Sequence, residues 1–344
     1  MTKSSKIKKA RLRTTAKPVN SGPLVIVLGA GASRSVSYGS KQGYPSFLDH
    51  DFFDLLQRWN ADHGSDKHST EIRWVLDKIR ALPNDYWRSM EKAFYTLHLR
   101  ALLAEKLDHA PTIDSDDTVV GNFAVSAETL LRAAHGRKIC NNHKELLSKL
   151  TPQDTIITFN YDLVVERAVR ERLERDGKNL GPWFYALNGT SKDPDGPRLI
   201  KLHGSSNWQI DGQHRLNVRT KSWQDFDDGP GYRAGSGEGT EFPIFLPFWD
   251  KRIEIEPWLR LWKTAYQALS TATRIIVWGY SLPPTDIKAQ HLFSLSLGSK
   301  KNLKFCIIDP AAETRERWRQ LLRDATYWEY DNIKQFFSQR PKWW

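Results

Sequence analysis

The sequence has little of several features that mark whole classes of protein. Its 344 residues include only two cysteines, Cys140 and Cys306, which excludes a disulfide framework and any zinc site built from two CxxC pairs. The apolar runs at residues 23–32 and 274–280 are much shorter than the about 20 residues of a membrane-spanning helix. The N-terminus also lacks the apolar core of a secretory signal. We therefore expect a soluble, cytoplasmic protein without a membrane contact.

Acidic residues are absent from the first 20 residues, which contain seven lysines or arginines. Because the formal net charge of the whole chain is +11, the other 324 residues carry only +4. We expect residues 1–22 to form a basic, disordered tail, since such a segment buries too little apolar surface to offset its chain entropy. A weak contact with nucleic acid is one role for this tail. A solvated tail without a partner is the alternative.

The rest of the chain has the composition of a packed globular protein, with 40% hydrophobic and 12% aromatic residues. Short apolar runs predict strands within residues 23–28, 154–160, 198–204, 274–282 and 303–308. Helical spacing occupies most of residues 47–150 and returns at 258–272, after 286 and at 314–322. Asp211 and Gly212 are typical of a type I′ turn, which predicts a hairpin over residues 207–218. The alternation predicts an α/β fold, a doubly wound parallel sheet with a large helical insertion at about 47–150 in a domain of residues 23–344.

Small and polar residues follow each predicted strand, at the edge where open parallel sheets bind their ligands. They are Gly29, Ala30, Gly31, Ala32 and Ser33, then Asn160 and Asp162, then His203, Gly204 and Ser205, then Gly279 and Ser281, and finally Asp309. Each has a structural interpretation: a tight turn for the glycines, helix caps for Asn160, Asp162 and Asp286, and a hydrogen-bonded structural role for His203. The first turn also lacks the third glycine of GxGxxG. Their common placement on one edge nevertheless favours a ligand site.

The motifs in their order resemble the sirtuin family, and more closely its bacterial branch of NAD hydrolases associated with anti-phage defence. "GAGAS" at residues 29–33 resembles the first phosphate-binding turn of that family, and "GYPSF" at 43–47 resembles the segment that follows it. "TFNYD" at 158–162 and "KLHGS" at 201–205 resemble the asparagine and catalytic histidine motifs. "GYSLPPTD" at 279–286 and "IIDP" at 307–310 resemble two later nucleotide-contacting segments. The resemblance implies a Rossmann-like fold and NAD as the substrate.

Two departures separate the chain from sirtuin deacylases. The zinc module that deacylases carry after the histidine motif is missing, because no cysteine lies in that region, and no zinc is expected. Leu48 stands where deacylases have an arginine, and the predicted helical insertion takes the place of their small domain. Both differences argue against protein deacylation, whereas cleavage of NAD requires neither feature.

The resemblance also implies a role for each candidate residue. Asp162 would hold the nicotinamide carboxamide, Asn160 would position a ribose hydroxyl or the attacking water, and His203 would act as the general base. The products would be nicotinamide and ADP-ribose, or a cyclic form if an internal nucleophile replaces water. Residues that would contact the rest of NAD are Gly29, Ala30, Gly31, Ala32, Ser33, Thr158, Gly204, Ser205, Gly279, Ser281 and Asp309.

Uncontrolled NAD hydrolysis would harm the host, so we expect a gate provided by oligomerisation or by a regulatory partner such as a nucleic-acid-sensing or ATPase subunit. Trp59, Trp74 and Trp87 in the helical stretch are either an interface or part of a core. A defence effector that depletes NAD in abortive infection is the favoured function. The alternatives are a non-catalytic module that binds NAD or ADP-ribose, a subunit of a nucleic-acid complex, and an NAD-dependent protein deacylase.

Overall fold

The computed structural model describes residues 22–34, 43–106, 115–135, 138–177, 182–185, 196–210, 216–218, 253–254 and 256–344. Its centre is a sheet in which all paired neighbours are parallel, in the order β3-β2-β1-β6-β7-β8. The strands are β1 (Leu24–Leu28), β2 (Thr155–Thr158), β3 (Arg198–Lys201), β6 (Arg274–Trp278), β7 (Lys304–Ile308) and β8 (Thr326–Tyr330). From β1, the next strands along the chain (β2 and β3) are added on one side, and the later strands (β6, β7 and β8) are added on the other, as in doubly wound folds. The predicted α/β, Rossmann-like fold is confirmed.

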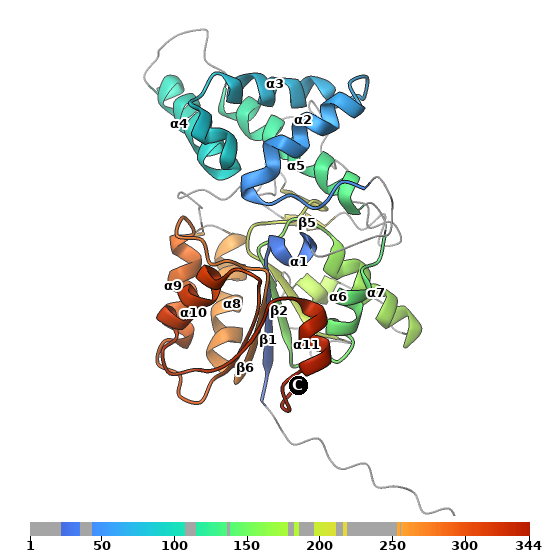
Figure 1. Ribbon diagram of the computed structural model, residues 1–344, viewed down its shortest axis with the longest axis vertical. Coiled ribbons are helices and arrows are strands. Elements are labelled where there is room, and N and C mark those ends of the chain that lie inside the picture. Colours follow the sequence, from blue (N-terminus) through green and yellow to red (C-terminus); the bar gives the residue numbers. More distant parts are fainter. Residues whose placement is uncertain are drawn as a thin grey trace, which may run out of the picture.

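Apolar, mostly β-branched runs form the central strands because helices cover both faces of the sheet. Every residue of β1, Leu-Val-Ile-Val-Leu, is buried, and so is every residue of β2. Helices α6 (Asn141–Leu147) and α7 (Val164–Arg175) lie on one side of the sheet (Figure 1). Helices α8 (Trp258–Thr271), α9 (Ile287–Leu297) and α10 (Ala312–Leu321) lie on the other, and α11 (Ile333–Gln339) follows β8. The short helix α1 (Ala30–Arg34) starts directly after β1.

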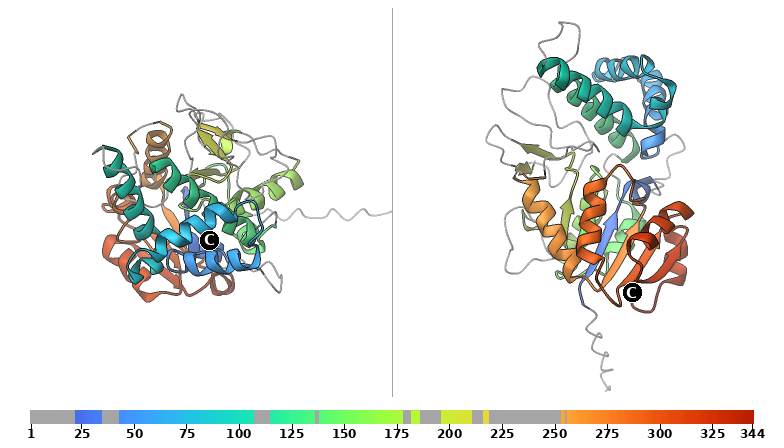
Figure 2. Two further views of the ribbon diagram at one scale, coloured as in Figure 1. Left: turned by 90° about the horizontal axis from the view of Figure 1, so that it is seen from above. Right: turned by 90° about the vertical axis from the view of Figure 1, so that its left-hand side faces the viewer.

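A separate group of helices lies between β1 and β2 in the chain, and we refer to its described residues, 43–106 and 115–135, as the helical block. It contains η1 (Asp49–Asp51), α2 (Phe52–Asp62), α3 (Ser69–Arg80), η2 (Asn84–Arg88), α4 (Met90–Lys106) and α5 (Asp116–His135). Figures 1 and 2 show the block stacked on one end of the sheet, opposite the end at which the chain enters β1.

The helical block has a hydrophobic core of its own. Phe52, Phe53, Phe94 and Phe123 are all buried there, and Phe123 makes ring contacts with the other three. Trp59 is buried in the same core, and Trp74 and Trp87 pack against it. Trp59 therefore serves core packing, the second of the two interpretations, and Trp74 and Trp87 contribute to the same core while remaining partly exposed.

Several elements differ from the sequence-based expectation. β8 and α11 were not anticipated, because Thr326–Tyr330 reads as a mixture of aromatic and charged residues and its burial is mostly intermediate, as on a sheet edge. The predicted hairpin is present as β4 (Trp208–Ile210) paired with β5 (Leu216–Val218). Ile210 pairs with Leu216, and residues 211–215, which include the predicted turn residues Asp211 and Gly212, connect the two strands. Those connecting residues lie outside the described part, as do residues 1–21 of the expected tail, and η3 (Pro182–Tyr185) precedes β3.

Within the described residues, the helices are too short or too polar to cross a bilayer.

Candidate functional site

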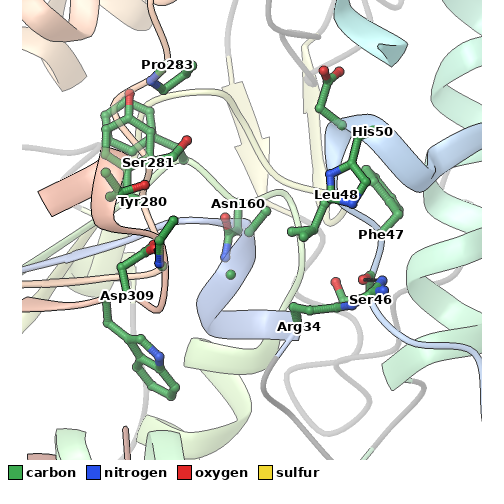
Figure 3. Close-up of a pocket in the computed structure, with 18 of the residues that line it drawn as sticks. Arg34, Ser46, Phe47, Leu48, His50, Asn160, Tyr280, Ser281, Pro283 and Asp309 are labelled. Carbon is green, nitrogen blue, oxygen red and sulfur yellow. Dashed lines mark hydrogen bonds between the residues drawn. The ribbon is translucent and has the colours of Figure 1, made fainter. Parts of the chain in front are cut away.

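A cavity of about 860 Å³ lies between the carboxyl ends of the strands and the helical block. Figure 3 shows Tyr280, Ser281, Pro283 and Asp309 on one wall, Arg34, Ser46, Leu48 and His50 on the other, and Asn160 between them. Of the residues predicted for the site, eight line the cavity: Ala30, Gly31, Asn160, Asp162, His203, Gly279, Ser281 and Asp309. The other six are not among the residues that line it: Gly29, Ala32, Ser33, Thr158, Gly204 and Ser205.

The glycine turns after β1 and β6 touch each other at the point where the strand order of the sheet reverses. A Cβ on Gly29 would lie 2.4 Å from the carbonyl oxygen of Gly279, and a Cβ on Gly279 would lie 2.2 Å from the amide nitrogen of Ala32. Gly279 also has a φ of +63°, which favours glycine. The amide of Gly31 donates to the Gly279 carbonyl (3.0 Å), and that of Ala32 donates to the Gly29 carbonyl (2.9 Å). Two amides expected to face a phosphate are thus used inside the protein.

Asn160, Ser33 and Asp162 form one hydrogen-bonded cluster beneath the cavity. The Asn160 amide nitrogen donates to the Gly29 carbonyl (2.8 Å) and to Ser33 Oγ (3.0 Å). Ser33 Oγ in turn donates to Asp162 Oδ2 (2.6 Å), and the amide of Val164 donates to Asp162 Oδ1 (3.1 Å) at the start of α7. Since its nitrogen is already committed, the part of the Asn160 amide left for a ligand is its oxygen, an acceptor.

The loop that carries Asn160 is held from both cores. Phe159 belongs to the core of the sheet and stacks on Tyr280, with ring centroids 3.9 Å apart and planes 2° from parallel. Tyr161 belongs to the core of the helical block, and burial raises the pKa of its hydroxyl well above the ordinary value. Thr158 supports the same loop, because its Oγ1 donates to the Leu28 carbonyl and accepts from the backbone amide of Asn160. Asn160 is therefore fixed at the boundary between the two cores.

His203 lines the cavity and is paired with a carboxylate from a distant part of the chain. Its Nε2 lies 3.1 Å from Asp286 Oδ2, and the two side chains are 6% and 3% exposed. The imidazole meets the Phe159 ring edge to face at 5.0 Å. Asp286 is the N-cap of α9, as the sequence indicated, since its Oδ1 accepts from the Ala289 amide (3.2 Å). Its contact with His203 was not foreseen, because 83 residues separate the two.

A buried ion pair supports the loops from behind the cavity. Lys201 and Glu166 are completely buried, with Lys201 Nζ 2.9 Å from Glu166 Oε1. Lys201 Nζ also donates to the backbone carbonyls of Tyr161 and Asp162. Burial raises the pKa of Glu166, and the neighbouring ammonium of Lys201 opposes that rise. Lys201 thus ties the end of β3 to the loop after β2, a role that the "KLHGS" motif did not reveal.

Gly204 and Ser205 belong to the turn after β3 and not to the cavity wall. Gly204 has a φ of +90°, which permits the reversal directly after His203. Ser205 is buried and donates to Asn207 Oδ1 (2.6 Å), and Asn207 donates to the Tyr185 hydroxyl (3.0 Å), which reaches Glu166. Both residues therefore stabilise the turn that presents His203.

The far wall of the cavity comes from the segments after β6, β7 and β8. Asp309 follows β7, its Oδ1 accepts from the Ala311 amide (2.9 Å), and burial raises the pKa of its carboxyl. Arg317 of α10 reaches across to the Ser281 carbonyl (2.9 Å). These residues form a polar end of the cavity, distant along the chain from Asn160 and His203.

The helical block supplies the opposite wall and two contacts that close it against the sheet. Arg34, at the end of α1, donates to the Ser46 carbonyl and forms an ion pair with Asp51 Oδ2, each at 2.7 Å. Glu91, at the start of α4, accepts from the Thr285 hydroxyl at 2.8 Å. Neither arginine, Arg34 or Arg317, was singled out from the sequence, where a single basic residue gives no signal among many.

The cysteines play no part in the cavity. Cys140 and Cys306 are both buried free thiols, and Cys306 lies in β7 as expected. No group of three or more potential ligands that could hold a metal ion occurs among the described residues.

Comparison with known proteins places this site in a family. The model of the SIR2-like domain family matches residues 154–335, which is more than half of the chain and includes the loops of Asn160, His203, Gly279 and Asp309. No curated protein matches the chain. A solved structure described as the basis for the mechanism and regulation of Sir2 enzymes is 15% identical, with 93% of this chain and 94% of that chain covered and a TM-score of 0.37.

Two further solved structures give similar values. A Sir2 homologue in complex with NAD is 13% identical, with 90% of this chain and 84% of that chain covered and a TM-score of 0.40. A Sir2 protein bound to an acetylated peptide is 16% identical, with 92% and 91% covered and a TM-score of 0.36. The family assignment rests on the family model, and on that ground the chain belongs to the SIR2-like domain family.

Proposed function

We propose that the protein is an NAD hydrolase that cleaves the bond between nicotinamide and ribose to give nicotinamide and ADP-ribose. One observation carries the proposal: Asn160, Asp162 and His203 line one cavity at the reversal point of a doubly wound sheet. An amide oxygen, a carboxylate and an imidazole in one cavity suit a reaction in which a pyridinium departs as neutral nicotinamide and a hydroxyl loses a proton.

Each of these three side chains has a distinct task in the proposed reaction. The Asn160 oxygen accepts a hydrogen bond from the attacking water or a ribose hydroxyl, and its fixed nitrogen sets the direction of that bond. His203 takes up the proton as the nucleophile attacks. Asp162 holds the nicotinamide amide through lone pairs that remain on oxygens already bonded to Ser33 and to the Val164 amide.

The rest of the cavity fits the other parts of NAD. Among its described lining residues, Arg34 and Arg317 are the arginines, and we assign them to the negatively charged diphosphate. Gly279, Ser281 and Asp309 are assigned to the adenosine side, with Asp309 toward a ribose hydroxyl. Phosphate contact by the backbone amides of Gly31 and Ala32 requires a shift of the hydrogen bonds that now hold them. In this proposal, the helical block is an insertion that closes the cavity.

Incubation of the purified chain with NAD, followed by mass spectrometry of the products, tests the reaction. We expect nicotinamide and ADP-ribose, and a cyclic product if an internal nucleophile competes with water. The variants His203→Ala and Asn160→Ala should lose at least about 10²-fold in rate, the usual size of a general acid–base contribution. His291→Ala is the matched control, because His291 is exposed on α9 and its Nδ1 contacts the Ile287 carbonyl of the same helix. Full turnover by His203→Ala would overturn the assignment.

We further propose that this activity depletes NAD in anti-phage defence and is gated by oligomerisation or by a protein partner. The support is the resemblance of the motifs to the defence-associated branch. Bacteria that express the wild-type chain should lose NAD after phage infection, whereas those with His203→Ala should keep it. If both strains keep NAD during infection, the role in defence is wrong even when the purified enzyme is active.

The same experiments separate the alternatives. A module that only binds NAD or ADP-ribose would bind without forming products. A deacylase would release O-acyl-ADP-ribose from NAD in the presence of an acylated peptide, and would do so faster than it hydrolyses NAD alone.

A further inference from the structure

Asp286 is a buried carboxylate that uses both of its oxygens. Oδ1 accepts from the Ala289 amide (3.2 Å), and Oδ2 is bonded to His203 Nε2 (3.1 Å) and to the Tyr280 hydroxyl (3.3 Å). The residue is 4% exposed. The backbone amide of Ala289 can only donate a hydrogen bond, so Asp286 Oδ1 is an acceptor. A buried carboxylate is stable only when such hydrogen bonds replace its hydration.

The backbone around Asp286 holds the carboxylate in place. Leu282 has a φ of +49°, an unfavourable conformation for leucine, and its side chain is buried at 3% exposure. Pro283 and Pro284 follow directly and restrict the chain further. Strain of this kind persists where the surrounding structure fixes a functional geometry. Here the fixed backbone holds Asp286 next to the imidazole of His203.

Helix capping does not account for this arrangement. A cap needs one oxygen, and serine, threonine or asparagine would serve at this position as well as aspartate. In Asp286 the cap uses Oδ1 alone. Oδ2 contacts His203, which lies 83 residues away in the chain. A carboxylate at this position stabilises a positively charged imidazole, which serine, threonine or asparagine would not do to the same extent.

We propose that Asp286 is a positioning residue for His203: it accepts a hydrogen bond from the Nε2–H group, fixes the tautomer of the imidazole and stabilises the imidazolium that forms during the reaction. The inference rests on the proposed function and deepens it. With the proton on Nε2, the lone pair of the neutral ring is on Nδ1, which is the atom that accepts a proton. Asp286 keeps its own charge throughout and does not take the proton.

The proton and electron balance of the step is simple. The oxygen of water, or of a ribose hydroxyl in the cyclic product, bonds to the anomeric carbon and gives its proton to Nδ1. The bond from that carbon to the nicotinamide nitrogen breaks, and its electron pair neutralises the pyridinium. The imidazolium then loses its proton to solvent, so that NAD and water yield nicotinamide, ADP-ribose and one proton.

Two substitutions that both keep the helix cap test the proposal. In Asp286→Asn, the amide oxygen still caps α9 while the NH₂ group faces Nε2, which favours the opposite tautomer. Asp286→Ser also caps α9 but is too short to reach the imidazole. We expect kcat to fall about 10²-fold or more in both, with KM within about threefold of wild type, because the loss falls on the reacting state and not on binding. Unchanged kcat, or a rise in KM alone, would overturn the proposal.

A spectroscopic measurement tests the same contact without turnover. In ¹⁵N-labelled protein, the imidazole signals of His203, identified among the ten histidines by their loss in His203→Gln, should show the proton on Nε2. Asp286→Asn should move that proton to Nδ1. This result would stand even if the chain failed to hydrolyse NAD, which would reject only the proposed reaction. A wild-type ring protonated on Nδ1 alone would reject the role of Asp286.

Discussion

The sheet and the helical block contribute to the cavity in different ways. The sheet side supplies the groups with chemical reactivity, because Asn160, Asp162 and His203 all follow buried strands whose positions are set by backbone pairing. The block supplies apolar residues such as Phe47 and Leu48 together with polar ones such as His50 and Glu91, from segments that pack around a separate core. The difference indicates that the sheet fixes the chemistry while the block encloses it. The two parts meet at Tyr161, which leaves the sheet but packs in the core of the block.

The largest expected effect comes from opening the core of the block. Phe123→Ala removes a fully buried ring that contacts three other phenylalanines, and should cost about 4 kcal/mol of unfolding free energy. If the two cores are independent, hydrogen exchange should accelerate in α2 to α5 and stay slow in β1, β6 and β7. Phe305→Ala in β7 is the matched change in the other core. Equal acceleration in both parts after either change would mean that they unfold as one unit.

Breaking the ion pair behind the cavity should have the next largest effect. Lys201→Met leaves Glu166 buried without its cation, which should cost about 3 kcal/mol in denaturant unfolding. The double variant Lys201→Met with Glu166→Gln removes the charge that was left behind and should recover much of this loss. A double variant less stable than Lys201→Met would mean that the carboxyl of Glu166 stabilises the protein without its partner.

A pH-dependent effect of intermediate size is expected on the sheet side, at His143 of α6. Burial lowers the pKa of His143 from 6.5 to about 4, in a contact with Cys140 and Trp278. Because the unfolded chain binds the proton first, stability is present above pH 6.5 and is lost as the pH falls toward 4, by about 2 kcal/mol between pH 7 and pH 5. His143→Gln should show that much less pH dependence in chemical denaturation. The same dependence in both proteins would assign the loss to other groups.

The smallest effect is expected at the contact that joins the two parts. Thr285→Val removes the hydroxyl that donates to Glu91, an exposed bond worth about 0.5–1 kcal/mol. Exchange at the amides of residues 89–91 should increase, whereas Thr264→Val, which alters only a bond within α8, should leave them unchanged. An increase in both variants would indicate general loosening of the protein.

The sequence predicted the sheet far better than the partners of the site residues. Runs such as Leu-Val-Ile-Val-Leu predict buried strands because few other structures bury five apolar residues in succession. β8 was missed because an edge strand is covered on fewer sides and tolerates charged residues. Once the strands are known, the residues at their carboxyl ends follow, and His203 and Asn160 were found in that way.

Partnerships across the chain leave no local pattern. Asp286 carries the signal of a helix cap, which is correct, and nothing near it in the sequence indicates His203. Lys201 and Glu166 become a pair only when β3 is placed beside the start of α7. The same applies to the contact of Gly31 with Gly279, which withdraws an amide that the motif had suggested for a phosphate.

That contact between the glycine turns limits how this cavity can change in evolution. Backbone meets backbone at Gly29 and Gly279, so a side chain at either position would push the two turns apart. These two positions consequently admit no side chain without a shift of the backbone. New ligand preferences must arise in the walls, through residues such as Leu48 and Ser281, or through the helical block.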